Sequence, residues 1–125
     1  MIEFKSDRIQ QEYKQLLVQN QRLYRLIECL SQFTSLEFNK PLFITSILRT
    51  EAEHKELYKD TPNAPTTSPH LFWRGVDLRS TIYTDTEIQR MLKFLNCFLY
   101  QGGAKPTAIY HSIAGNAIHF HVQYA

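Results

Sequence analysis

Apolar positions that recur every three or four residues predict two amphipathic helices of three or more turns in this chain. The longer begins at a capping Ser6 or Asp7 and continues to Phe33, with Gln, Lys and Arg on its polar face. The other runs from Thr84 to Leu99 and starts with a threonine and an aspartate, both of which cap helices well. We therefore expect a long N-terminal helix and a second helix in the C-terminal half.

Shorter apolar runs predict the strands. A partly β-branched run after a proline, Leu42–Leu48, indicates a buried strand, and a short helix is expected over Thr50–Lys59. A further strand is expected over His70–Leu78. Near the C-terminus, Thr107–Ser112 and Ala117–Tyr124 flank an Ala-Gly-Asn turn signal, which predicts a hairpin.

This order of elements predicts an α+β fold: a small antiparallel sheet with a C-terminal hairpin, covered by the long N-terminal helix and the second helix. A chain of 125 residues is too short for two independent cores, so residues 1–125 should form one domain. The segment Asp60–Pro69 holds three prolines and no apolar period, which predicts a loop. Loops of this length in small domains are often functional.

Charge and composition narrow the function. The net charge is +2, from 14 basic and 12 acidic residues without a block of one sign, so neither nucleic acid nor a membrane is expected as a partner. The polar N-terminal residues do not resemble a signal peptide, so we expect cytoplasmic synthesis and delivery elsewhere by lysis or another route. Cys29 and Cys97 lie within apolar helical patterns and are expected to be buried free thiols.

The sharpest chemical signal is His119-Phe120-His121. In a strand, residues two apart point to the same face, about 6.6 Å from each other, so both imidazoles would face one site. Zinc sites use histidine and carboxylate ligands, and a catalytic site keeps one position open. By itself this triplet is also consistent with two histidines on a solvated sheet face.

His70 and Asp77 add a third imidazole and a carboxylate. Their odd separation puts them on opposite faces of an ideal strand, so a joint site requires a bend near Gly75 or a His70 that lies in the loop. The alternative is that Asp77 caps or pairs with Arg74 or Arg79 and that His70 merely follows a proline.

Three segments together resemble a known family. The stretch SPHLFWRGVD (68–77) resembles the signature S-x-H-x-x-G-x-A-x-D of zinc D-alanyl-D-alanine carboxypeptidases and L-alanyl-D-glutamate endolysins, which have a hedgehog-like fold. SILRT (46–50) is similar to the family's S-G-Y-R-[ST] segment, and the C-terminal H-x-H is similar to its last motif. The motifs occur in the family's order.

The resemblance implies a role for each matching residue. His70, Asp77 and His121 would be the ligands of one Zn²⁺, and His119 would be the active-site histidine. Arg49 would receive a carboxylate or carbonyl of the substrate, a bacterial cell-wall (peptidoglycan) peptide that contains D-amino acids. Two further assignments belong to the same motifs: Ser46 would contribute to substrate binding, and Ser68 would order the His70 loop.

The chain also departs from the family pattern. Trp73 stands at the family's glycine, Gly75 at its alanine and Leu48 at its tyrosine. Ile118 occupies the place of the glutamate that serves many members as the general base. A base is needed to take a proton from the attacking water, and His119 is the residue of that motif able to do so.

Three more residues are weaker candidates. His111, on the preceding hairpin strand, is either a substrate contact or a surface histidine. Trp73 either lines the substrate cleft or is a half-buried core tryptophan. His54 shares a helix face with Glu51, but a solvated face explains this pair.

These observations favour a zinc-dependent peptidase of bacterial cell walls, a hydrolase or endolysin that a phage would encode and that would act at the cell wall after release. The alternative is a non-catalytic structural or virion-associated module that kept the peptidase fold, suggested by Ile118. A small zinc enzyme with a non-peptide substrate is a third possibility, because fold and metal do not determine the reaction.

Overall fold

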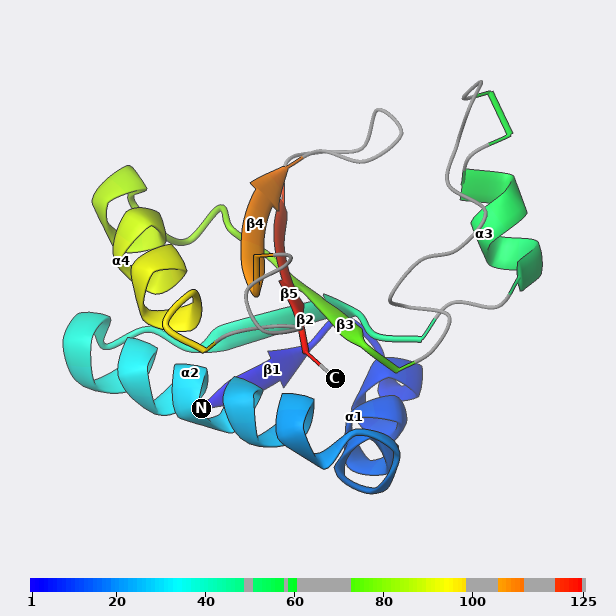
Figure 1. Ribbon diagram of the computed structural model, residues 1–125, viewed down its shortest axis with the longest axis horizontal. Helices are drawn as coiled ribbons and strands as arrows, with labels where there is room; N and C mark the ends of the chain where they lie inside the picture. Colours follow the sequence, from blue (N-terminus) through cyan, green and yellow to red (C-terminus); the bar gives the residue numbers. More distant parts are fainter. Residues whose placement is uncertain (49–50, 58, 61–72, 99–105, 112–118, 125) are drawn as a thin grey trace.

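The computed structural model shows an α+β fold in which helices pack on one face of a five-stranded sheet (Figure 1). It describes residues 1–48, 51–57, 59–60, 73–98, 106–111 and 119–124. The elements, in chain order, are β1 (Ile2–Phe4), α1 (Asp7–Gln19), α2 (Gln21–Phe38), β2 (Leu42–Ser46), α3 (Glu51–Leu57), β3 (Gly75–Leu78), α4 (Asp85–Leu95), β4 (Ala108–His111) and β5 (His119–Gln123).

The sheet has the strand order β1-β2-β3-β5-β4 and is mixed. β2, β3, β5 and β4 are antiparallel neighbours, as expected, but β1 pairs with β2 in parallel, with Ile2 opposite Leu42 and Phe4 opposite Ile44. The expected antiparallel arrangement is therefore confirmed for these four strands, and β1 adds a parallel strand at the edge of the sheet, where no element was predicted. A three-residue strand has too little alternation to be recognised, and its pairing partner lies some forty residues further along the chain.

The predicted C-terminal hairpin is confirmed as far as its strands are described. β4 and β5 are antiparallel neighbours, with His111 opposite His119 and Ile109 opposite His121. The connecting Ala-Gly-Asn turn lies outside the described residues, as do most of the Asp60–Pro69 loop and the start of the strand predicted from His70. β3 begins at Gly75.

The long N-terminal helix is two helices, which corrects the prediction of one. Asn20 interrupts it with φ −152° and ψ 81°, and its side-chain oxygen accepts a hydrogen bond of 3.2 Å from the Leu23 amide. Asn20 thereby acts as the N-cap of α2. The predicted caps of α1 and α4 are confirmed: Ser6 accepts from the Ile9 amide, and Thr84 forms a capping box with Glu87.

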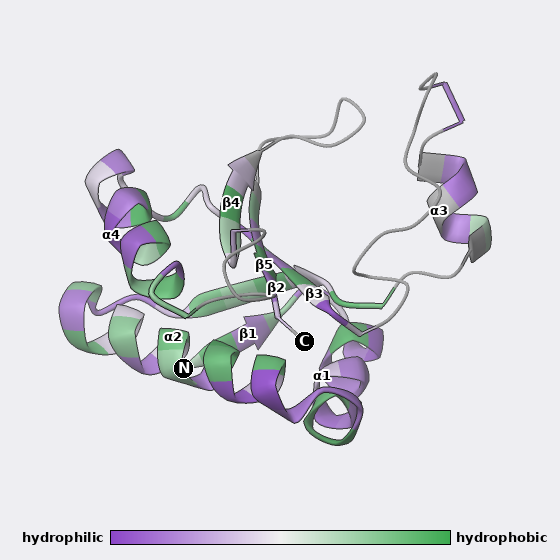
Figure 2. Ribbon diagram, viewed as in Figure 1, coloured by the Kyte–Doolittle hydropathy of each residue, from purple (hydrophilic) through white to green (hydrophobic). Residues whose placement is uncertain are grey.

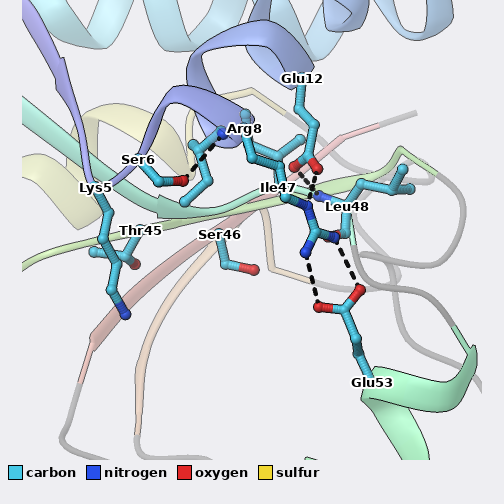
Figure 3. Close-up of a pocket in the computed structure, with 10 residues that line it drawn as sticks. Lys5, Ser6, Arg8, Glu12, Thr45, Ser46, Ile47, Leu48 and Glu53 are labelled. Carbon is cyan, nitrogen blue, oxygen red and sulfur yellow. Dashed lines mark hydrogen bonds and ion pairs between the residues drawn. The ribbon is translucent and has the colours of Figure 1, made fainter.

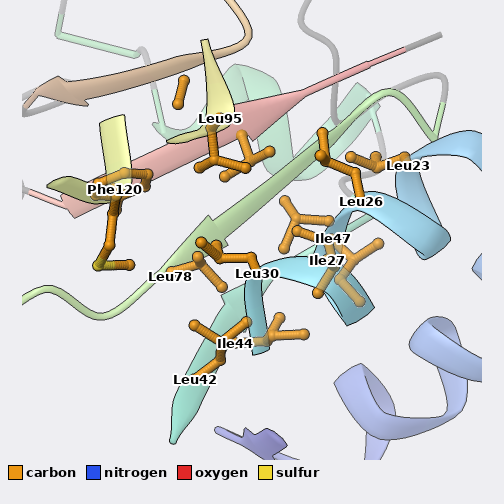
Figure 4. Close-up of a cluster of buried hydrophobic side chains, with 14 of the residues drawn as sticks. Leu23, Leu26, Ile27, Leu30, Leu42, Ile44, Ile47, Leu78, Leu95 and Phe120 are labelled. Carbon is orange, nitrogen blue, oxygen red and sulfur yellow. The ribbon is translucent and has the colours of Figure 1, made fainter. Parts of the chain in front are cut away.

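The hydrophobic core lies between one face of the sheet and the helices α1, α2 and α4 (Figure 4). In Figure 2, α2 and α4 carry alternating hydrophobic and hydrophilic bands, as expected for helices that bury one side. The strands contribute every second residue. The fully buried side chains among them are Leu42, Ile44, Val76, Leu78, Phe120 and Val122. α3 lies apart from the other helices (Figure 1).

Both cysteines are exposed free thiols, which contradicts the expected burial. Cys29 lies on the side of α2 that faces away from the core, and Cys97 follows the end of α4, where its thiol lies 3.3 Å from the Lys93 carbonyl oxygen. The prediction of burial was wrong because a position inside an apolar helical pattern can lie one residue away from the stripe that faces the core. No helix in the described part of the chain has the length and apolar character to cross a membrane.

Candidate metal centre

Asp77 and His121 form a buried pair on the sheet face opposite the helical layer. Asp77 on β3 is the register partner of His121 on β5, and the aspartate Oδ1 lies 2.7 Å from the histidine Nδ1. Each residue is 4% exposed. Their neighbours along the strands are core residues, so alternation points both polar side chains away from the core. The sheet thus brings together two predicted zinc ligands that are 44 positions apart in the chain.

The second ring nitrogen of His121 also faces an oxygen atom. Its Nε2 lies 3.3 Å from Oε1 of Gln123, and the Gln123 amide nitrogen donates a 2.8 Å hydrogen bond to the Pro106 carbonyl. That bond orients the glutamine oxygen toward the ring. A neutral imidazole has one N–H, so it donates to only one of two oxygens. Two oxygen atoms therefore face the two ring nitrogens of His121, an arrangement that leaves room for a cation bound at one nitrogen.

The strand next to Asp77 supplies Ser46, a predicted substrate-binding residue. Ser46 is the register partner of Asp77, and the preceding Thr45 donates a 3.3 Å hydrogen bond from its hydroxyl to the Asp77 backbone carbonyl. An irregularity in the pairing between Ile44 and Ser46 accompanies this contact. Ser46, Asp77 and His121 consequently form one row across three strands.

The remaining predicted site residues are described only in part. His119 precedes His121 by two positions on β5, and the register places it opposite His111 on β4. The backbone therefore puts both two residues along their strands from the Asp77–His121 row, with the Phe120 row between them. The third predicted ligand, His70, and the predicted substrate cation, Arg49, lie outside the described residues, as does Ser68.

Trp73 is half-buried and packs against the hydrophobic core, which matches the core alternative for this residue. Its backbone has φ 58°, in the left-handed region that favours glycine. Its carbonyl accepts a 2.8 Å hydrogen bond from the Asn20 side chain. A bulky residue in this conformation carries a steric cost, so the turn before β3 is held by its surroundings.

A pocket of about 300 Å³ lies beside Ser46, at the end of β2 (Figure 3). Arg8 crosses it: its Nε lies 2.8 Å from Glu12, and its terminal nitrogens bind Glu53 at 3.1 and 2.8 Å. The hydrogen bonds that the Arg8 guanidinium donates to Glu53 and then to Glu12 raise its pKa. Glu12 is buried and accepts a 3.2 Å hydrogen bond from the Leu48 amide.

These charged residues were not recognised as a unit from the sequence. The spacing of Arg8 and Glu12, four positions apart on one helix, was the available signal. The partner Glu53 is 45 positions away from Arg8. The network connects α1, the end of β2 and α3, and so holds both sides of the segment that contains Arg49.

Comparisons of the chain with family profiles, characterised proteins and solved structures gave no match. Within the described ranges, no group of three His, Cys, Asp or Glu side chains is placed to hold a metal ion. Two donors of the predicted three, a carboxylate and an imidazole, lie together, and the third falls at residue 70. The donor types fit zinc, which binds nitrogen and carboxylate oxygen ligands in proteins.

Proposed function

We propose that this chain is a zinc-dependent peptidase that cleaves bacterial cell-wall peptides. The observation that carries the proposal is the buried contact between Asp77 and His121, at 2.7 Å on adjacent strands. Buried carboxylate–imidazole pairs occur in structural networks as well as in sites. Here the two residues are those that the motif resemblance assigns to the metal.

A second observation supports the resemblance itself. The family signature has glycine where this chain has Trp73, and Trp73 has φ 58°. A glycine at this position of the signature would adopt the left-handed backbone conformation without steric cost. The side chain at this position departs from the signature, while a positive φ is a conformation that glycine adopts readily.

In the proposed site, Asp77 and His121 hold Zn²⁺ together with His70. Zinc supplies Lewis acidity that polarises a carbonyl group and makes water reactive near neutral pH. His119, on the same strand as His121, takes and returns the proton, because Ile118 replaces the usual glutamate. Arg49 binds the peptide and offsets negative charge that develops on the scissile carbonyl. Ser46, in the row of Asp77, contacts the peptide backbone.

The replacement of the glutamate by Ile118 also favours a second candidate, a structural or virion-associated module that keeps the metal site without hydrolysis. A phage-encoded protein that reaches the cell wall after lysis fits either candidate. The two differ in a single measurable property, the release of new amino and carboxyl termini from peptidoglycan.

The test is the metal content of chelator-free protein and its activity on peptidoglycan fragments, with Asp77→Ala and the exposed Asp60→Ala as a matched control. We expect about one zinc per chain and hydrolysis in the wild type and in Asp60→Ala, and loss of both in Asp77→Ala. Zinc with no hydrolysis would favour the structural module. Hydrolysis retained in Asp77→Ala would reject the proposed site, as would a wild-type protein without zinc after growth in zinc-replete medium.

A further inference from the structure

Arg79 lies on the same face of the sheet as Asp77 and follows it by two positions. Its backbone amide donates a 2.9 Å hydrogen bond to the Phe43 carbonyl, which continues the β2–β3 ladder past Leu78. Two residues of extended chain span about 6–7 Å, so Arg79 and Asp77 are separated by roughly one or two residues of a bound peptide.

The Arg79 guanidinium is held against an aromatic ring. Its central carbon lies 3.9 Å from the centroid of the Phe43 ring. Phe43 alternates with the fully buried Leu42 and Ile44, so its half-buried ring lies on the face away from the core. Stacking on a ring uses the flat face of the guanidinium and leaves the N–H groups at its edge for other partners.

Among the described residues, those N–H groups have no carboxylate partner. Arg8 is paired with Glu12 and Glu53, and Arg90 with Glu37, whereas Arg79 has no ion pair or side-chain hydrogen bond within the described structure. Arg79 is exposed, and its partner on the ring side is uncharged. A fixed, unpaired guanidinium presents a fork of donors that matches a carboxylate in two-point geometry.

The next strand completes the row. The register pairs Leu78 with Phe120, so a further step along β3 brings the Arg79 backbone next to His119, and His119 is opposite His111. Phe43, Arg79, His119 and His111 therefore occupy one row across the sheet. That row lies two residues along the strands from the row of Ser46, Asp77 and His121, with the core-facing row of Leu78 and Phe120 between them.

We propose that Arg79 is a specificity residue that binds a carboxylate of the peptide ligand, one or two residues away from the bond held at Asp77 and His121. The site would then select acidic peptides over neutral ones of the same shape. The inference rests on the proposed function for the class and position of the ligand. The competing explanation is that Arg79 merely covers the Phe43 ring.

The test uses a ligand that cannot be cleaved. The probe is an N-acetylated L-alanyl-D-glutamate analogue in which a methylene replaces the peptide carbonyl, and its counterpart is the neutral diamide. Binding of both to the zinc-loaded protein is measured by calorimetry. Arg79→Met removes the charge but keeps an apolar, polarisable cover on Phe43, so folding should be retained. Arg90→Met is the matched control, because Arg90 also stacks on an aromatic ring, Phe38, but in the helical layer.

We expect the wild type and Arg90→Met to bind the acid about tenfold more tightly than the diamide, and Arg79→Met to bind the two about equally. Arg79→Lys should recover part of the preference, because it keeps the charge without the two-point geometry. The proposal is overturned if the wild type binds neither probe or binds both equally, if Arg79→Met keeps the preference, or if both methionine variants lose it alike.

Failure of the proposed function would look different. If the wild type prefers the acidic probe through Arg79 but neither retains zinc nor cleaves peptidoglycan, the role of Arg79 in anion binding stands and the peptidase function is rejected. Conversely, the wild type could show no acidic preference while Arg79→Met cleaves neutral peptides at the wild-type rate. The peptidase function would then stand, and this role of Arg79 would be rejected.

Discussion

The side-chain amide of Asn20 donates a 2.8 Å hydrogen bond to the carbonyl oxygen of Trp73. The same nitrogen lies 2.6 Å from the carbonyl oxygen of Tyr124, just beyond β5, while the side-chain oxygen caps α2. One residue at the break between two helices therefore holds the start of β3 and the end of β5, the strands that carry Asp77 and His121.

We predict that Asn20→Ala destabilises the protein by about 2–4 kcal/mol, because it removes a helix cap and leaves two carbonyls without their donor. Asn20→Ser keeps a capping oxygen and should recover about 1 kcal/mol. Chemical denaturation measures both. Equal stability of the alanine and serine variants would show that the cap contributes nothing. A wild-type free energy of unfolding for Asn20→Ala would show that its hydrogen bonds to Trp73 and Tyr124 do not stabilise the fold.

Zinc should stabilise the folded chain through Asp77. A ligand that binds only the folded state at 100 times its Kd adds about 2.7 kcal/mol. We therefore expect the melting temperature of the wild type to rise with added zinc and to fall with a chelator. Asp77→Asn should lose this dependence, and Asp60→Asn should keep it. A zinc response that survives in Asp77→Asn would place the metal elsewhere.

Removal of the Arg8 side chain should release α3. Arg8→Met breaks the contacts with Glu12 and Glu53, with an expected loss of about 1 kcal/mol in global stability, since the arginine is largely exposed. The larger effect should be faster amide hydrogen exchange in α3, measured by mass spectrometry. Lys59→Met, which breaks the exposed pair with Glu56, is the control and should leave α3 unchanged. Unchanged exchange in Arg8→Met would mean that this network does not hold α3.

The Glu87 carboxylate should make stability depend on acid. Its hydrogen bond with Lys40, followed by the one from the Thr84 amide, lowers its pKa below the ordinary value of 4.5. A carboxylate with a lowered folded-state pKa contributes stability above its unfolded pKa, and that contribution disappears as the pH falls through the folded-state pKa.

The matching experiment follows melting temperature between pH 7 and pH 2 for the wild type, Glu87→Gln and Lys40→Met. The wild type should lose stability with acid more steeply than Glu87→Gln, and Lys40→Met should also show a shallower decline. Parallel curves for all three proteins would contradict the lowered pKa as a source of acid sensitivity.

Local features of the fold were readable from the sequence. The caps at Ser6 and Thr84, the position of α4 and the two strands of the C-terminal hairpin were predicted, because each depends on side chains within a few residues of one another. The α+β class followed from the order of these elements. The resemblance also selected Asp77 and His121, which the structure brings into contact.

Other features depend on partners that are distant in the chain. β1 is a strand because Ile2 and Phe4 pair with β2. The break at Asn20 occurs where its amide reaches Trp73 and Tyr124, which are 53 and 104 positions away. Neither partner can be recognised from the residues around Asn20, so the apolar pattern predicted one continuous helix.

The site shows the same division. The sequence by itself indicated the candidate site residues, because imidazoles, carboxylates and their spacing are local properties. Tertiary structure decided which of them meet: the register of β3 and β5 joined Asp77 to His121, and the stacking of Arg79 on Phe43 left a cation on the same face. Strand register follows from the packing of alternate residues into a shared core, and that packing exists only when the whole sheet is assembled.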